Sequence, residues 1–436
     1  MSEPSRPTVV TIEEPRLATR RRERRRIPRH VLVALPLALA GLISLLVSGN
    51  ALRPFERVIT IEAKMASKSD YFKDPEVQRL LLKHGIRVDI QRLGSRGVAT
   101  QSWQGLDVVF PSGQPAAKLI LRKANRSLSS TRPFVTPLVL ATFRDYAETL
   151  EKQGVAVAQK QGGDTLYYNL EMNEFVDLLD GLKPNGEKPQ AHELKKVDTW
   201  HGLGFDDLNP PKRNSGRILV RTSSVCESNS AGTYLSILSF VENGNVVPVA
   251  DDAEDDTSAA GGAEARDPVL DLAKKVEPLI SLQGMWADEQ ADSYFSGEGE
   301  SIAPIAVIYE HQYLAHQLDH HKKYGKPDTE RVLLYPTPYA LTEPQLIALT
   351  DEGEQLVELI RTDTELRRRA TELGFRVRFS GAEGSSDELN AYLREHGIQE
   401  PARNSDQTKV DIPDLNVLEK IINEVGDCPP VEGSTP

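Results

Sequence analysis

Cysteine is scarce in this chain, with only two in 436 residues. Cys226 and Cys428 stand about 200 residues apart, and C-x-x-C does not occur, so the sequence supports neither a cysteine zinc site nor a thioredoxin-like redox site. In an oxidising compartment the two cysteines could form one disulfide that closes a long loop. The alternative is two unrelated thiols, and the spacing alone does not decide between them.

Recognisable catalytic motifs are missing as well. The sequence contains no G-x-S-x-G, S-x-x-K, H-E-x-x-H or P-loop pattern. His316 and His320 lie four residues apart in a predicted helix and could share a metal ion. Their surroundings, HQLDHHKK, are more typical of a solvated helix face. We therefore expect a protein that is not an enzyme and that needs no cofactor or metal.

Long apolar runs are absent after Leu52, which makes the single run before it informative. The apolar segment Val31–Val47 directly follows seven arginines between Arg20 and Arg29. With its flanks it approaches the ~20 residues that cross a bilayer, and the arginines favour a cytoplasmic N-terminus. We predict a basic cytoplasmic region at 1–30, a transmembrane signal anchor at 31–52 and an extracytoplasmic remainder on the cell membrane. The alternative is a cleaved signal peptide, for which 48–51 is a poor cleavage site.

Positive charge is in short supply beyond residue 30. Residues 31–436 carry 43 Lys and Arg against 60 Asp and Glu, a net charge of −17, whereas the whole chain has −12. Nucleic-acid binding requires Lys and Arg to neutralise phosphates. The composition therefore argues against a nucleic-acid partner.

Strand and helix patterns alternate along the exported part. A β-branched run at 58–63 precedes Asp74-Pro75, which is typical of a capped helix start, and a second alternating strand follows at 86–90. Similar units recur up to a long charged helix predicted at 350–373 and a last helix at 415–425. This order predicts an α/β fold with mostly parallel sheets flanked by helices.

Small polar residues recur where predicted strands give way to helices. Open α/β sheets bind ligands beyond the carboxyl ends of their strands, and the unpaired N–H groups of a helix start suit anionic or polar groups. Simple helix capping explains any one of these loops equally well. The candidate ligand-binding residues in these loops are Ser67, Ser69, Ser112, Gly113, Gln114, Ser228, Asn229, Ser230, Gly232 and Thr233.

Several segments, in order, resemble the extracellular solute-binding proteins of the type 2 periplasmic-binding-protein fold, the receptors of ABC importers. The segments that carry the resemblance are KMASKSDYFKDP at 64–75, DVVFPSGQP at 107–115, PFVTPLVLATFRD at 133–145, SNSAGT at 228–233, PIAVIYEHQ at 304–312 and VLLYPTP at 332–338. Departures include Ala231 within the small-residue turn, Cys226 in the preceding loop and the acidic insertion 251–267.

The resemblance implies two lobes that close around a small polar or anionic solute. It places the first lobe at 55–141 and 327–380, the second lobe at 142–326 with the flexible insertion 251–267, and a loop-rich extension with one helix at 381–436. It adds Glu310 to the ligand-facing residues and implies an ABC permease or membrane sensor as partner. Two other functions stay open: an envelope assembly protein with a degenerate cleft, and an envelope enzyme without a visible catalytic constellation.

Overall fold

The computed structural model describes residues 58–124, 126–160, 164–181, 198–208, 212–250, 267–282, 285–286, 290–378, 387–401 and 409–428. The predicted basic region 1–30, the predicted anchor 31–52 and nearly all of the insertion 251–267 lie outside these residues. Among the helices that are described, none combines the length and apolar character needed to cross a membrane.

The first sheet, on which the first lobe is built, has the strand order β2-β1-β3-β13-β4. Its strands are β1 (Ile59–Met65), β2 (Ile86–Arg92), β3 (Val108–Phe110), β4 (Ser130–Thr131) and β13 (Leu346–Ala348). β1 is parallel to both β2 and β3, while β13 is antiparallel to its neighbours. Helices cover both faces, so alternate residues enter different cores: Phe110 packs in one cluster and Val109 in the other.

The second sheet, on which the second lobe is built, follows the path β6-β7-β11-β5-β10-β8-β9, with β12 and β14 also paired to β5. Its strands are β5 (Phe134–Phe143), β6 (Ala156–Ala158), β7 (Tyr167–Glu171), β8 (Val220–Ser223), β9 (Met285–Trp286), β10 (Ile305–Tyr309), β11 (Arg331–Thr337), β12 (Leu341–Thr342) and β14 (Arg376–Val377). β5 runs antiparallel to β10 and β11, so the prediction of mostly parallel sheets is wrong and both sheets are mixed.

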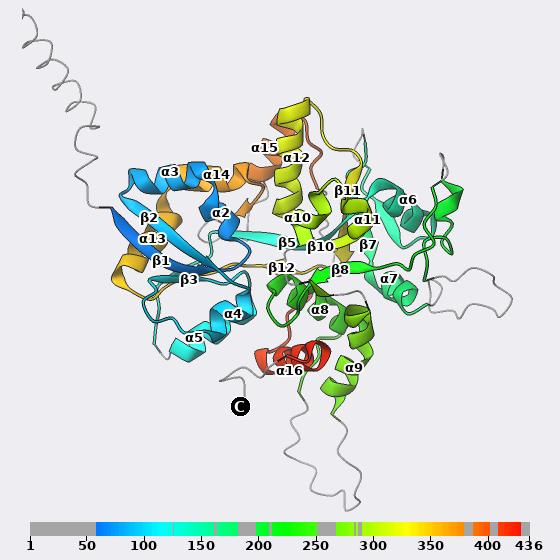
Figure 1. The fold of residues 1–436 in the computed structure, drawn as a ribbon, viewed down its shortest axis with the longest axis horizontal. Helices are drawn as coiled ribbons and strands as arrows, with labels where there is room; N and C mark the ends of the chain where they lie inside the picture. Colours follow the sequence, from blue (N-terminus) through cyan, green and yellow to red (C-terminus); the bar gives the residue numbers. More distant parts are fainter. Residues whose placement is uncertain are drawn as a thin grey trace, which may run out of the picture. The chain divides into compact units, whose positions relative to one another are not determined.

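The helices pack around these two sheets (Figure 1). Those of the first lobe are α2 (Ser69–Lys73), α3 (Pro75–Lys83), α4 (Ser95–Thr100), α5 (Gln114–Ala124), α13 (Asp351–Thr362) and α14 (Thr364–Glu372). Those of the second lobe and its C-terminal extension are α6 (Arg144–Lys152), α7 (Met172–Leu179), the 3-10 helix Phe205–Asp207, α8 (Asn229–Glu242), α9 (Pro268–Ser281), α10 (Gln290–Phe295), α11 (Gly299–Ile302), α12 (Glu310–Tyr324), α15 (Asp387–Glu395) and α16 (Leu415–Gly426).

β5 is the strand through which the chain first passes between the lobes. All of its residues are buried. Phe134 stacks on Phe375 in the first-lobe core, whereas Leu138 and the residues after it belong to the second-lobe core. The chain therefore passes from one core to the other within β5, and β11 lies in the second sheet. β11 does so because it pairs with β5.

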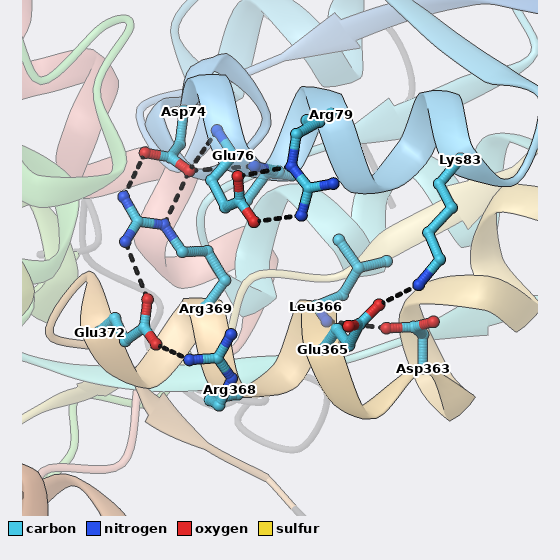
Figure 2. A network of polar contacts seen from close by, with 11 residues as sticks. Asp74, Glu76, Arg79, Lys83, Asp363, Glu365, Leu366, Arg368, Arg369 and Glu372 are labelled. Carbon is cyan, nitrogen blue, oxygen red and sulfur yellow. Dashed lines mark hydrogen bonds and ion pairs between the residues drawn. The ribbon is translucent and has the colours of Figure 1, made fainter. Parts of the chain in front are cut away.

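Asp74 fixes the start of α3, as Asp74-Pro75 predicted. Its Oδ1 accepts hydrogen bonds from the amides of Glu76 and Val77. The same carboxylate accepts two bonds from Arg369 of α14, Nε at 2.9 Å and Nη2 at 2.7 Å (Figure 2). Although burial opposes ionisation, these hydrogen bonds hold the pKa of Asp74 below its ordinary value. The ion pair thus joins two helices that are almost 300 residues apart.

Two helix predictions in the C-terminal part are wrong. The single helix predicted at 350–373 is interrupted at Asp363, because this side chain accepts a bond from the amide of Leu366 and begins α14 as a separate helix. The extension also contains α15 in addition to the predicted last helix. Leu389 and Leu393 bury one face of α15 in the second-lobe core, which the Gly- and Ser-rich sequence before it obscured.

Candidate functional site

The loops that were predicted to bind ligand lie at the carboxyl ends of parallel strands. β1, β2 and β3 are parallel, so the loops that follow them, 66–68, 93–94 and 111–113, meet at one edge of the first sheet. In the second sheet, β8 and β10 are parallel, and the loop 224–228 and the start of α12 share an edge. These are the positions at which α/β sheets bind ligands.

Serine hydroxyls connect the loops of the first lobe. The Oγ atoms of Ser67 and Ser112 are 2.7 Å apart, and the amide of Ser112 donates to Ser95 Oγ at 2.9 Å. Lys68 is fully buried beside them, with Nζ 3.4 Å from Ser67 Oγ. Ser69 is also fully buried, and its hydroxyl finds no hydrogen-bond partner among the described residues. These loops therefore form a compact polar surface.

The start of α8 supplies the opposing polar surface. Ser228 and Ser230 have their Oγ atoms 2.8 Å apart. Asn229 Nδ2 donates to the hydroxyl of Tyr309 at 3.1 Å and to Thr233 Oγ1 at 3.3 Å. Asn229 is thereby held by two side chains and lies at the point where α8 meets the end of β10.

The two lobes are in close contact at Gly113 and Gly94. A Cβ on Gly113 would lie 2.1 Å from Asn229 Oδ1, and one on Gly94 would lie 2.3 Å from the carbonyl oxygen of Glu227. The Lys68 ammonium lies 2.6 Å from the centre of the Tyr309 ring. At Gly94 the neighbouring atoms are backbone, so the observed approach requires glycine there, whereas a side chain at Gly113 would displace the end of the Asn229 side chain.

Beside this contact a cavity of about 480 Å³ lies between the lobes. Three of the predicted residues line it: Ser67, Ser228 and Asn229. Residues that the sequence analysis missed complete the lining: Ala66, Arg92, Leu93, Gly94, Ser95, Ser223, Glu227, Asp292 and Ser293. Those from 92 to 95 run from the last residue of β2 to the first residue of α4, so the rule used for the loops after β1 and β3 would have found them.

The other predicted residues do not line this cavity. Gly113 lies at the contact between the lobes, and Ser69, Ser112 and Ser230 are buried. Gln114 is bonded to the backbone of β12 and of the residue after it, as donor to the Leu341 carbonyl and acceptor from the Glu343 amide. Gly232 and Thr233 instead line a smaller cavity of about 40 Å³ between α4, α5, α8 and α16.

Glu310 has a structural role rather than the predicted ligand-facing one. It is fully buried and accepts bonds from the Tyr335 hydroxyl at 2.6 Å and from Arg376 Nε and Nη2 at 2.6 and 2.5 Å. Burial, followed by the Glu310 charge, raises the pKa of Tyr335 well above its ordinary value. Both carboxylate oxygens of Glu310 accept hydrogen bonds, and its ion pair with Arg376 joins α12 to β14.

His311 lies next to the contact between Lys68 and Tyr309. Its ring stacks on Phe375 at 4.0 Å between centroids, and Nδ1 is 3.2 Å from Thr136 Oγ1. Burial and, secondly, the Lys68 charge hold the pKa of His311 well below its ordinary value. The imidazole is therefore neutral at physiological pH.

The C-terminal helix α16 connects both lobes at the flank of the cleft. Leu415 packs in a first-lobe cluster, whereas Leu418 and Ile421 pack in the second-lobe core. Cys428, just past the helix, forms a disulfide with Cys226 in the loop before α8. Arg96 of α4 donates to Glu419 Oε2 through Nε at 3.1 Å and Nη2 at 2.9 Å. We call this set of contacts the α16 clamp.

No protein-family model matches the chain, and no curated protein matches it. Among solved structures, it is similar to iron-bound HitA from Pseudomonas aeruginosa, with 11% identity, a TM-score of 0.47 and coverage of 84% of this chain and 99% of that one. It is also similar to the periplasmic binding protein AfuA from Actinobacillus pleuropneumoniae, with 10% identity, a TM-score of 0.47 and coverage of 84% and 98%. A third similar structure is the periplasmic molybdate-binding protein of Azotobacter vinelandii, with 10% identity, a TM-score of 0.39 and coverage of 73% and 99%. These values are too low to transfer a ligand to this chain.

Proposed function

We propose that this chain is an extracytoplasmic solute-binding protein that captures a small polar solute between its two lobes. The observation that carries the proposal is the cavity of about 480 Å³, to which loops of both sheets contribute. Its volume falls in the range of roughly 300–1,000 Å³ that is typical of small-molecule sites. A ligand that contacts both lobes favours the closed arrangement, and the closed form would then engage an ABC-type permease or a membrane sensor.

The lining favours a solute rich in hydroxyl or amine groups. Serine hydroxyls and the Asn229 amide supply both donors and acceptors. The charged lining residues are one guanidinium, Arg92, and two carboxylates, Glu227 and Asp292. This balance gives little support to the anionic solute that the loop composition suggested.

The alternative of an assembly protein has one observation in its favour. The contacts of Lys68 with Tyr309 and of Gly113 with Asn229 fill part of the space between the predicted loops with the chain's own atoms. A cleft used only as a packing surface would have such contacts. In that case a stable protein partner, rather than a small solute, would be found.

Thermal unfolding of the full-length chain against a panel of sugars, amino acids, oxyanions, metal ions and peptides tests the proposal. A solute at a hundred times its dissociation constant adds about 2.7 kcal/mol to the free energy of unfolding. We expect a saturable stabilisation by a polar member of the panel. A flat response to the whole panel would contradict the receptor function and favour the assembly protein.

We also propose that residues 31–52 anchor the chain in the membrane, with residues 1–30 in the cytoplasm. The support is the apolar run and the arginines that precede it. Full-length protein should stay in the membrane pellet after an alkaline carbonate wash, and a variant without 31–52 should be released. Release of both proteins by the wash would contradict the anchor.

A further inference from the structure

A second pocket lies in the first lobe and shares no lining residue with the cleft. Its volume is about 290 Å³, and it is formed by the strand starts at 130–134, the facing parts of α13 and α14, and the end of β14. Four arginines are among its lining residues, namely Arg132, Arg361, Arg367 and Arg378, and no Asp or Glu is. We call it the arginine pocket. Such a concentration is unexpected in a chain with a net charge of −12.

Two of the pocket arginines share one carboxylate. Glu343 accepts from Arg132 Nη1 at 3.1 Å and from Arg378 Nη1 at 2.9 Å, so one carboxylate serves two guanidinium groups. Arg361, which also lines the pocket, forms an ion pair with Glu358. Arg132, Arg378 and Arg361 thus have two carboxylate partners between them, which leaves net positive charge on this set.

The arginine side chains of the pocket are partly exposed. The side chain of Arg132 is 45% exposed, that of Arg378 30% and that of Arg361 54%. Tyr71 and Phe134 form the buried back wall. Guanidinium groups bind carboxylates and phosphates through paired N–H donors. The pocket therefore offers forked donors around a space large enough for a small molecule.

We propose that the arginine pocket binds a small multivalent oxyanion, such as a phosphorylated or polycarboxylate metabolite. This site is separate from the solute cleft and does not depend on the cleft binding a solute. Because the arginines lie near the surface, the attraction is screened by salt, and the affinity falls as ionic strength rises.

Calorimetric titration of the full-length chain with pyrophosphate and with citrate at constant, low ionic strength tests the proposal. We expect saturable binding of one equivalent of at least one probe. R378Q and R361Q should each weaken this binding about tenfold, the loss of one charge-assisted contact. Arg361 is half exposed and paired on the surface, so R361Q is expected to fold even if R378Q does not.

Two matched variants remove an arginine elsewhere. Arg368 of α14 is not among the lining residues of the pocket and pairs with Glu372 (Figure 2), and Arg92 lines the cleft. R368Q and R92Q should each change the affinity less than twofold. The proposal is overturned if neither probe binds at about ten millimolar, if R92Q abolishes binding while the pocket variants leave it unchanged, or if all four substitutions weaken it equally.

Discussion

Glu419 is the residue through which the α16 clamp is most sharply tested. Its side chain is 7% exposed and that of Arg96 is 11% exposed, so the ion pair between α4 and α16 is largely removed from water. Arg96 also donates to Asn423 Oδ1 at 2.9 Å and to the Cys226 carbonyl at 3.4 Å. The guanidinium therefore depends on acceptors from α16 and from the loop before α8.

The substitution Glu419→Gln removes the negative charge while keeping the shape of the side chain. Removing one partner of a buried ion pair costs about 3–5 kcal/mol, because the remaining charge stays buried without compensation. The glutamine oxygen still accepts one bond from Arg96, so we expect a loss near the lower end, about 3 kcal/mol. Replacing both partners with methionine removes both charges, and the same reasoning predicts a much smaller loss.

Urea unfolding of the full-length chain, with its disulfide oxidised, measures these losses. Glu424 on the same helix is exposed, so Glu424→Gln should change the free energy of unfolding by less than about 0.5 kcal/mol. A loss below about 1 kcal/mol for Glu419→Gln, or a double methionine variant that is less stable than Glu419→Gln, would refute the reasoning about the buried pair. Refutation would mean that α16 does not hold α4 through this contact.

Three further predictions concern the other long-range contacts. Replacing Cys226 and Cys428 together by serine should lower the free energy of unfolding by about 3–5 kcal/mol, since their disulfide closes a loop of 202 residues; equal urea midpoints for variant and oxidised parent would contradict this. Asp74→Asn keeps a helix cap but loses the charge that pairs with Arg369. Because the pKa of Asp74 is lowered in the folded chain, the ion pair contributes to the free energy of unfolding above about pH 4. This contribution is lost as the pH falls through the folded pKa. The stability difference between parent and Asp74→Asn should therefore shrink on acidification, and a pH-independent difference would exclude the ion pair as its cause. Glu310→Gln should destabilise the chain by about 3 kcal/mol in urea, as expected for a buried pair, while leaving solute affinity unchanged; a selective loss of affinity would restore Glu310 to the binding site.

Local sequence patterns predicted the elements that depend on local chemistry. Asp74-Pro75 begins α3 where the capping pattern placed it, and the polar loop that ends at Ser228 does precede α8. The ion pair of Glu310 with Arg376 was not predicted, because the two residues are 66 positions apart and nothing in the neighbourhood of either indicates the pairing. Arg92 was missed although its place after a parallel strand was readable from the same pattern.

Long-range pairing accounts for the remaining differences. The first residue of β5 packs in the first-lobe core, and the residues from Leu138 onward pack in the second-lobe core. Only the pairing of β5 with β11 shows where the chain passes between the lobes. The disulfide of Cys226 likewise depends on α16, because this helix brings Cys428 to the loop before α8 from about 200 residues downstream. Periodicity and capping describe single elements, so they do not determine which distant elements meet.

Filling the cleft is the most direct test of the central claim that a polar solute binds between the lobes. Ser228→Trp places a large side chain in the cavity, and Val249→Trp, at an exposed position of the second lobe, is the matched control. Both variants and the parent would be titrated calorimetrically with the solute that gives the largest thermal stabilisation. We predict one bound equivalent for the parent and for Val249→Trp and no binding for Ser228→Trp. Unchanged affinity in a folded Ser228→Trp would contradict binding in the cleft.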